Sequence, residues 1–107
     1  MNSKDDKKKE ILRELAAQYF SRESNRLSMI TITDVEIQAH GTRAVILMTV
    51  LPESEEESAV SFAHRQLSEF KKYVQENSRI ARIPFFDVRI DIGEKNRQHM
   101  DEIGKTI

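Results

Sequence analysis

The sequence has no cysteine among its 107 residues, which excludes disulfide bridges and thiolate metal sites. Glycine occurs only at Gly41, Gly93 and Gly104, and this wide spacing excludes both a dinucleotide-binding GxGxxG motif and a P-loop. The longest apolar run, over 44–48, is far shorter than the ~20 residues that span a bilayer. The first residues are charged and lack the apolar stretch of a signal peptide. We therefore expect a cytoplasmic protein without membrane contact.

Side chains that perform catalysis are not found in recognisable patterns. The three histidines, His40, His64 and His99, have no partner at metal-ligand spacing. The acidic run over 55–57 begins a predicted helix, where acids usually interact with the helix dipole. No nucleophile-elbow pattern occurs. We therefore expect no catalytic residue, no metal ligand, no cofactor and no small-molecule substrate, and we interpret the chain as a binding protein rather than an enzyme.

The composition is typical of one globular domain. Apolar residues make up 38% and charged residues 33% of the chain, which separates it from disordered sequences. We expect a single domain over 1–107, with its core over about 5–92 and a polar tail, loosely held or forming a short helix, over 93–107. The net charge of −1 is low for a nucleic-acid-binding protein, so the distribution of charge matters more than its sum.

Hydrophobic periodicity predicts the secondary structure of the first half of the chain. Apolar residues at spacings of three and four predict an amphipathic helix over 5–22. Residues 29–38 are rich in Ile, Thr and Val, which predicts a strand. The alternation of this strand changes face at Thr33-Asp34, where a bulge would bring all of its apolar residues to one side.

A tight turn is predicted to join this strand to a second one. Residues 39–42 have turn composition, and Gly41 can adopt a positive φ. The strand that follows, over 43–51, is apolar on both faces, as expected for a central strand under helices. Two strands joined by so short a turn should pair antiparallel.

The second half of the chain predicts helical structure and then a third strand. Ser54 and Glu57 have the spacing of a capping box, and the apolar stripe behind them is long enough for two consecutive helices or one bent helix. Pro84 ends helical structure, and alternation over 86–92 predicts a strand with one buried face. The expected fold class is α+β, in the order αββααβ, with helices on one face of a three-stranded sheet.

Cations gather in and behind the last predicted helix. Lys71 and Lys72 lie off the apolar stripe and therefore project outward, and Arg79 and Arg82 lie in the segment that leads to the third strand. Arg65 precedes them on the same helical region. Exposed lysines and arginines of this kind bind phosphate groups.

The same cations are equally typical of a solvated helix. Arg65–Glu69 and Lys72–Glu76 have the i,i+4 spacing of ordinary surface ion pairs. The pattern alone therefore leaves RNA contact and plain surface charge as alternatives, of which the second is the more common.

Phe85 is the one aromatic residue that strand parity directs away from the predicted core. Its side chain could stack on a nucleobase or cover a helix end. We favour the helix end, because the neighbouring residues do not form a stacking platform of the RNP type.

Three stretches of the sequence, at 25–37, 44–51 and 79–91, resemble the bacterial ribosome-binding factor A family. NRL at 25–27, followed by ITITDVEI at 30–37, is similar to the family segment D-P-R-L-x-x-V-T-V-T-D-V-E-V. AVILMTVL at 44–51 is similar to its second strand. The residues at 79–91 resemble its ending R-L-R-x-V-P-x-L-x-F-x-x-D, through Arg79, Arg82, Ile83, Pro84, Phe86, Val88 and Asp91.

The resemblance implies a type II KH-like domain without catalytic activity. It implies an assembly factor that binds the small ribosomal subunit and its rRNA during late maturation and rRNA processing, and that is associated with growth at low temperature. Carried over by position, Arg26 is a loop arginine and Arg79 and Arg82 flank the last helix. We expect a monomer. The predicted RNA-binding residues are Arg26, Arg65, Lys71, Lys72, Arg79 and Arg82.

The sequence also departs from the family pattern. The family's Ala-x-Gly kink between its last two helices aligns with residues 66–68, where neither Ala nor Gly is retained. Proline is absent before Arg26, and no long basic C-terminal extension is evident. Asp34 matches the family pattern but is not expected to contact RNA, because a carboxylate repels phosphate. We expect it to support the bulge or turn instead. A protein–protein interaction module on the same scaffold is the alternative function, and the near-neutral charge favours it.

Overall fold

The computed structural model of the chain describes residues 3–23 and 28–105, with side chains described over 6–22 and 28–100. No helix in these ranges is both long enough and apolar enough to cross a membrane. In chain order, the elements are α1 (Ser3–Glu23), β1 (Met29–Gln38), η1 (Ala39–Gly41), β2 (Arg43–Leu51), η2 (Glu53–Glu55), α2 (Glu56–Arg65), α3 (Leu67–Asn77), β3 (Phe85–Ile90) and α4 (Ile92–Lys105).

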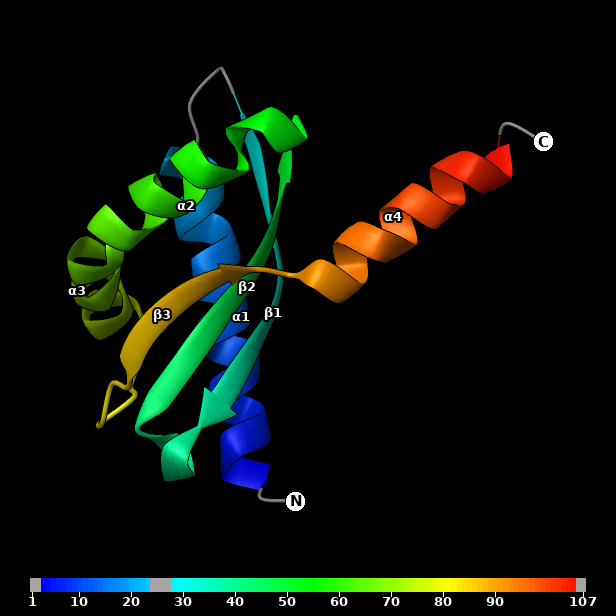
Figure 1. The fold of residues 1–107 in the computed structure, drawn as a ribbon. Coiled ribbons are helices and arrows are strands. Elements are labelled where there is room, and N and C mark those ends of the chain that lie inside the picture. Colours follow the sequence, from blue (N-terminus) through cyan, green and yellow to red (C-terminus); the bar gives the residue numbers. More distant parts are fainter. Residues whose placement is uncertain (1–2, 24–27, 106–107) are drawn as a thin grey trace.

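The three strands form one mixed sheet in the order β1-β2-β3 (Figure 1). β1 pairs antiparallel with β2, as the short connection between them predicts. β3 pairs parallel with β2, because the α2–α3 crossover returns the chain to the starting end of the sheet. The predicted α+β class and the order αββααβ are confirmed, with α4 added behind β3.

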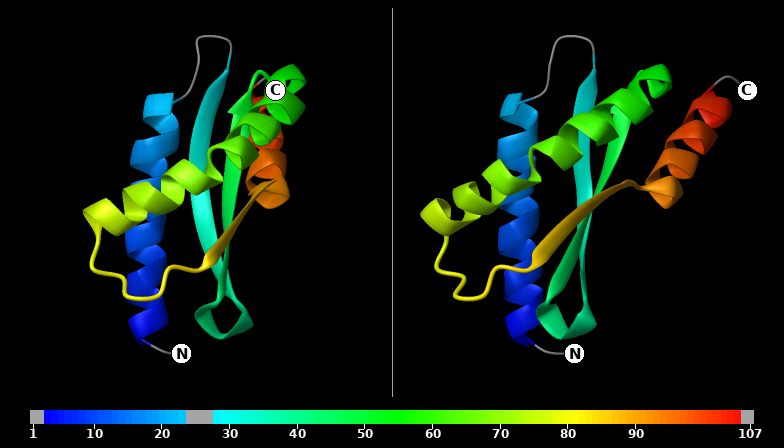
Figure 2. Two further views of the ribbon diagram at one scale, coloured as in Figure 1. Left: turned by 90° about the vertical axis from the view of Figure 1, so that its left-hand side faces the viewer. Right: turned by 60° about the vertical axis from the view of Figure 1, so that its left-hand side comes forward.

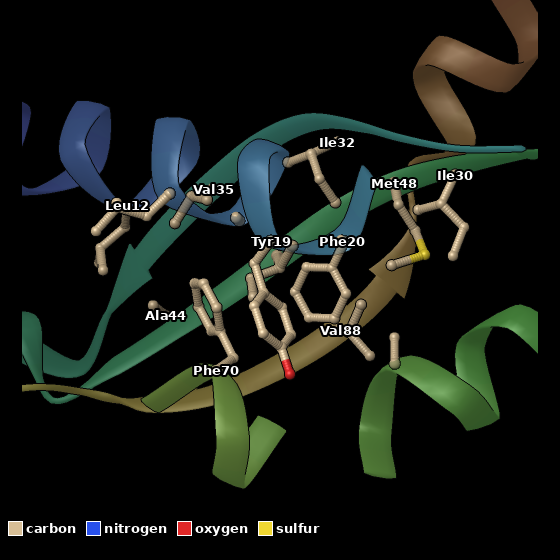
Figure 3. Packing of buried hydrophobic residues seen from close by; sticks show 14 of the residues in the cluster. Leu12, Tyr19, Phe20, Ile30, Ile32, Val35, Ala44, Met48, Phe70 and Val88 are labelled. Atoms are coloured by element: carbon tan, nitrogen blue, oxygen red, sulfur yellow. The ribbon is translucent and has the colours of Figure 1, made fainter. Parts of the chain in front are cut away.

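The hydrophobic core lies between one face of the sheet and helices α1, α2 and α3. Phe20 of α1 and Phe70 of α3 are both fully buried, with their ring centroids 5.4 Å apart. Figure 3 shows these rings beside Tyr19, in one cluster with inward residues of the strands such as Met48 and Val88. Of the apolar residues whose 3.6-residue periodicity predicted α1, Leu12, Leu15, Tyr19 and Phe20 are buried, whereas Ile11 is exposed.

The bulge predicted in β1 is present, because the register with β2 shifts between Ile32 and Asp34. Ile32 and Val35 both reach the core as a result. The Val35 N–H donates to Asp34 Oδ1 at 2.8 Å, and Lys9 Nζ lies 3.4 Å from the same oxygen. These contacts support the structural role expected for Asp34.

The turn between β1 and β2 is a short 3₁₀ segment with three successive positive φ angles. Gly41 has φ +88°, as predicted, but Ala39 and His40 also lie in the left-handed region, at 52° and 55°. A side chain in this region costs roughly 1–2 kcal/mol per residue. The Thr42 N–H and hydroxyl both donate to the Ala39 carbonyl, at 3.2 and 2.7 Å, and so stabilise the turn.

The predicted capping box at Ser54 and Glu57 is wrong. Ser54 lies inside the 3₁₀ turn η2, and α2 begins later, at Glu56. The Glu55 N–H donates to the Pro52 carbonyl at 2.9 Å, so this turn takes up the residues that would have preceded the helix. The N-cap of α2 is Glu55, which makes no side-chain capping bond.

The apolar stripe is divided between two helices, α2 and α3, which form one bent rod across the sheet (Figure 2). The break is at Gln66, whose N–H is shared between the carbonyls of Phe62 and Ala63, each at 3.1 Å. Its φ and ψ of −88° and −4° are open to any residue, so the break needs neither Ala nor Gly. The Tyr19 hydroxyl donates to Gln66 Oε1 at 2.8 Å and holds the break against α1.

The end of the chain differs from the prediction. The third strand was expected over 86–92 but spans Phe85–Ile90. Of the two alternatives for 93–107, a loose tail or a short helix, the structure has the helix, which is the 14-residue α4. Asp91 accepts a hydrogen bond from the Glu94 N–H at 3.0 Å, which makes it the N-cap. Asp91 and Glu94 have capping-box spacing, a signal that was overlooked. α4 leaves the sheet beyond β3 (Figure 1) and is tied to the start of α2 by Lys95–Glu56 at 3.0 Å.

Candidate nucleic-acid interface

Helix α3 directs its lysines outward because its apolar side chains face the core. Phe70 and Val74 are fully buried, and Leu67 packs against them at the edge. Lys71 and Lys72 fall between these positions and are both exposed. The outward direction predicted from the stripe is therefore what the structure shows.

The segment between α3 and β3 directs its arginines outward in the same way. Ile80 and Ile83 pack against the core at its edge. Arg79 and Arg82 each precede one of these isoleucines, and both are exposed. Ser78 begins the segment by donating its hydroxyl to the Val74 carbonyl at 2.8 Å, which closes the end of α3.

The predicted cations are arranged around the α2–α3 rod and do not form one patch. Lys71 borders a hollow beside the start of β3, and Lys72 borders another that contains Arg22 of α1. Arg65 borders a third hollow, together with Ser28 at the start of β1. Arg26 lies outside the described residues.

Most of these cations have no acidic partner. Within the described ranges, no carboxylate lies within 4.0 Å of the charged groups of Arg65, Lys71, Arg79 or Arg82. Lys72 does pair, with Glu69 at 3.4 Å, one turn before it. The ion pairs that i,i+4 spacing suggested for Arg65 and Lys72 are not formed among the described residues.

Two arginines and a histidine, which the sequence prediction did not assign to the site, surround Asp87 on the edge strand β3. Its carboxylate accepts a hydrogen bond from Arg43 at 2.8 Å and lies 3.5 Å from Arg89 Nε and 3.6 Å from His64 Nε2. Burial alone would raise the pKa of Asp87. The Val88 N–H and the Arg43 guanidinium outweigh burial and lower this pKa below its ordinary value. Arg43 and Arg89 are thus partly neutralised, unlike Arg65 and Lys71 on the rod.

Groups suited to metal binding do not gather in the described part of the chain. No three His, Cys, Asp or Glu side chains there are placed to hold a metal ion. Every buried side-chain polar atom there has a hydrogen-bond partner. The exposed cations of α2, α3 and the segment behind α3 are the remaining candidates for ligand contact.

Comparison with known proteins finds likeness in structure only. No family model and no curated protein sequence matches the chain. The crystal structure of ribosome-binding factor A from Thermus thermophilus is similar, with a TM-score of 0.66 and 16% identity over 74% of this chain and 86% of that one. The solution structure of a Thermotoga maritima protein, provisionally assigned as a ribosome binding factor A, has a TM-score of 0.56 and 18% sequence identity, over 76% of each chain. The chain therefore has the KH-like fold of these structures.

Proposed function

We propose that this protein binds rRNA on the small ribosomal subunit and acts as an assembly factor during late maturation. The observation that carries the proposal is a set of exposed cations, at Arg65 and Lys71 on the α2–α3 rod and at Arg79 and Arg82 in the segment behind it, none of which has an acidic partner among the described residues. The likeness in fold to structures described as ribosome-binding factor A supports the ribosome as the partner. The role is binding and not catalysis.

Unpaired cations favour a polyanion for a physical reason. An arginine or lysine already held by a carboxylate must break that ion pair before it can contact a phosphate, whereas an unpaired one only releases water and counterions. The near-neutral total of −1 does not prevent binding, since the acidic residues of 53–57 lie at the opposite end of α2 from Gln66. The local field at the rod decides the encounter with RNA.

Cosedimentation with purified small subunits tests the proposal. We expect binding to fall steeply as the salt concentration rises. The double variant K71E/R82E should lose most of the binding, and the slope of log affinity against log salt should become shallower by roughly 1.5, because two phosphate contacts are removed. Both side chains are exposed, so the free energy of unfolding should change by only about 0.5 kcal/mol.

K7E/R97E is the matched control, because it makes the same change in net charge on exposed residues of α1 and α4. We expect it to bind nearly as well as the wild type. An equal loss in both variants would mean that total charge, and not the rod, determines binding. If association with the subunits survives nuclease treatment of the RNA, the alternative of a protein–protein interaction module is favoured.

A further inference from the structure

Phe85 is exposed to an extent that burial in the fold does not explain. Its side chain is 82% exposed, the highest value among the large apolar residues that the structure describes. The interpretation that it covers a helix end is therefore wrong, because so exposed a ring covers very little. The backbone beneath it is well held: the Phe85 N–H donates to the Thr42 carbonyl at 2.9 Å, and Pro84 precedes it. The ring is thus presented to solvent from a rigid strand end.

A hollow of about 200 Å³ lies beside this ring, between the start of α3 and the start of β3. Leu67, Ile83 and Pro84 provide its apolar walls. Its volume is below the roughly 300–1,000 Å³ of typical small-molecule sites, so it suits one planar ring system rather than a whole cofactor. Phe86, whose ring centroid lies 4.9 Å from that of Phe70, connects the hollow to the core.

The polar groups of the hollow favour a nucleotide. Ser68 and Lys71 border it, one with a hydroxyl that can bond a base edge and the other with an ammonium suited to phosphate. None of the residues lining it is acidic. The hollow beside α1 has Asp6 and Glu36, and the one between α1 and α3 has Glu69 and Glu76 in its lining. Charge complementarity therefore distinguishes the Phe85 hollow as a place for an anionic ligand.

We infer that Phe85 stacks on an unpaired nucleobase of single-stranded RNA, with Lys71 contacting its phosphate. This inference rests on the proposed RNA-binding function and makes it more specific. A base inside a duplex cannot reach the ring, because its faces are already stacked on neighbouring bases. An unpaired base has both faces free, and an exposed aromatic side chain is the usual platform for it. The protein thereby discriminates between single-stranded and paired segments of its RNA.

Fluorescence anisotropy with a short labelled oligoribonucleotide, and with a hairpin duplex of equal phosphate number, tests this inference. F85A should weaken binding of the single strand by roughly fivefold to a hundredfold, the loss expected for one stacked base. Binding of the duplex should not change. M29A is the control, because Met29 is a large apolar side chain, 64% exposed, on another strand. M29A should bind both RNAs as the wild type does.

The variant F85W gives an independent readout, because the chain has no tryptophan. Stacking should quench the fluorescence of this single indole when the oligoribonucleotide is added, and affinity should be retained. Unchanged affinity in F85A, or equal losses for single strand and duplex, would overturn the inference. The inference would also be overturned if F85A bound RNA normally but no longer bound a protein partner. If K71E/R82E abolishes subunit binding while F85A binds as the wild type does and the indole of F85W is not quenched by RNA, the proposed function stands and only the stacking role fails.

Discussion

The hydrogen bond between Thr33 and Asp91 joins the bulge of β1 to the N-cap of α4, and its removal is the most informative test of how α4 is held. The Thr33 hydroxyl donates to Asp91 Oδ2 at 2.6 Å, across 58 positions of sequence. The same carboxylate caps α4 through Oδ1. This Thr33 hydrogen bond is the main cause that lowers the pKa of Asp91, and the Glu94 N–H adds to it.

The expected magnitudes follow from these contacts. A hydrogen bond to a charged group is worth about 1.5–3 kcal/mol, and partial exposure of both residues places this one near the lower end, so T33V should cost about 1.5 kcal/mol. D91A should cost about 2.5 kcal/mol, because it also removes an N-cap worth about 1 kcal/mol. The double variant should cost little more than D91A alone, which gives a coupling energy of about 1 kcal/mol.

Urea unfolding monitored by circular dichroism measures all three variants. T31V is the matched control, since Thr31 is an exposed threonine on the same strand, and it should change stability by no more than about 0.5 kcal/mol. Additive effects of T33V and D91A, within about 0.3–0.5 kcal/mol, would refute a direct energetic link between the bulge and α4.

Two further predictions concern acid stability and the core. The pKa values of Asp87 and Asp91 in the folded protein lie below the ordinary 3.8. The stability that these carboxylates contribute is therefore complete above pH 3.8 and is lost as the pH falls through their folded-state pKa values. In D91N the free energy of unfolding, measured by circular dichroism, should depend less steeply on pH in this acid range. F70A should cost about 3–5 kcal/mol in chemical denaturation, because it removes a fully buried ring packed against Tyr19, Phe20 and the third strand. A cost for F70A below about 1 kcal/mol would contradict the core described above.

Periodicity predicted those features that depend on neighbours in the sequence. The change of face at Thr33-Asp34 was enough to place the bulge, because an extra residue is the simplest way to return the apolar side chains of a strand to one side. The alternation of the third strand was enough to direct Phe85 outward. Both predictions succeeded because side-chain direction in a strand has a period of two.

Local signals were less reliable where two of them competed. Ser54 and Glu57 have the spacing of a capping box, yet a 3₁₀ turn after Pro52 moved the start of α2 to Glu56. At α4, the low hydrophobicity of the segment left a loose tail and a short helix as alternatives, and the capping signal of Asp91 was not used to choose between them. Capping sequences indicate where a helix can begin, and tertiary contacts select among the candidates.

The position of the cations relative to one another also required the structure. The stripe showed that Lys71 and Lys72 point outward, but one borders the Phe85 hollow and the other a hollow shared with Arg22 of α1. Which of them retained an acidic partner was not predictable either, because Lys72 pairs with Glu69 and not with Glu76. Long charged side chains have several partners within reach, and small differences in packing choose between them.

By itself, the sequence determined the order of the elements from α1 to β3, the core-facing apolar stripe of α2 and α3, and the outward direction of Lys71, Lys72 and Phe85. These properties arise from side-chain periodicity within single elements, which does not depend on the rest of the chain. Only the tertiary structure decided the parallel pairing of β3, the link from Thr33 to Asp91 and the hollow beside Phe85. Those features join residues far apart in the sequence, and close packing of the whole core determines which of them meet.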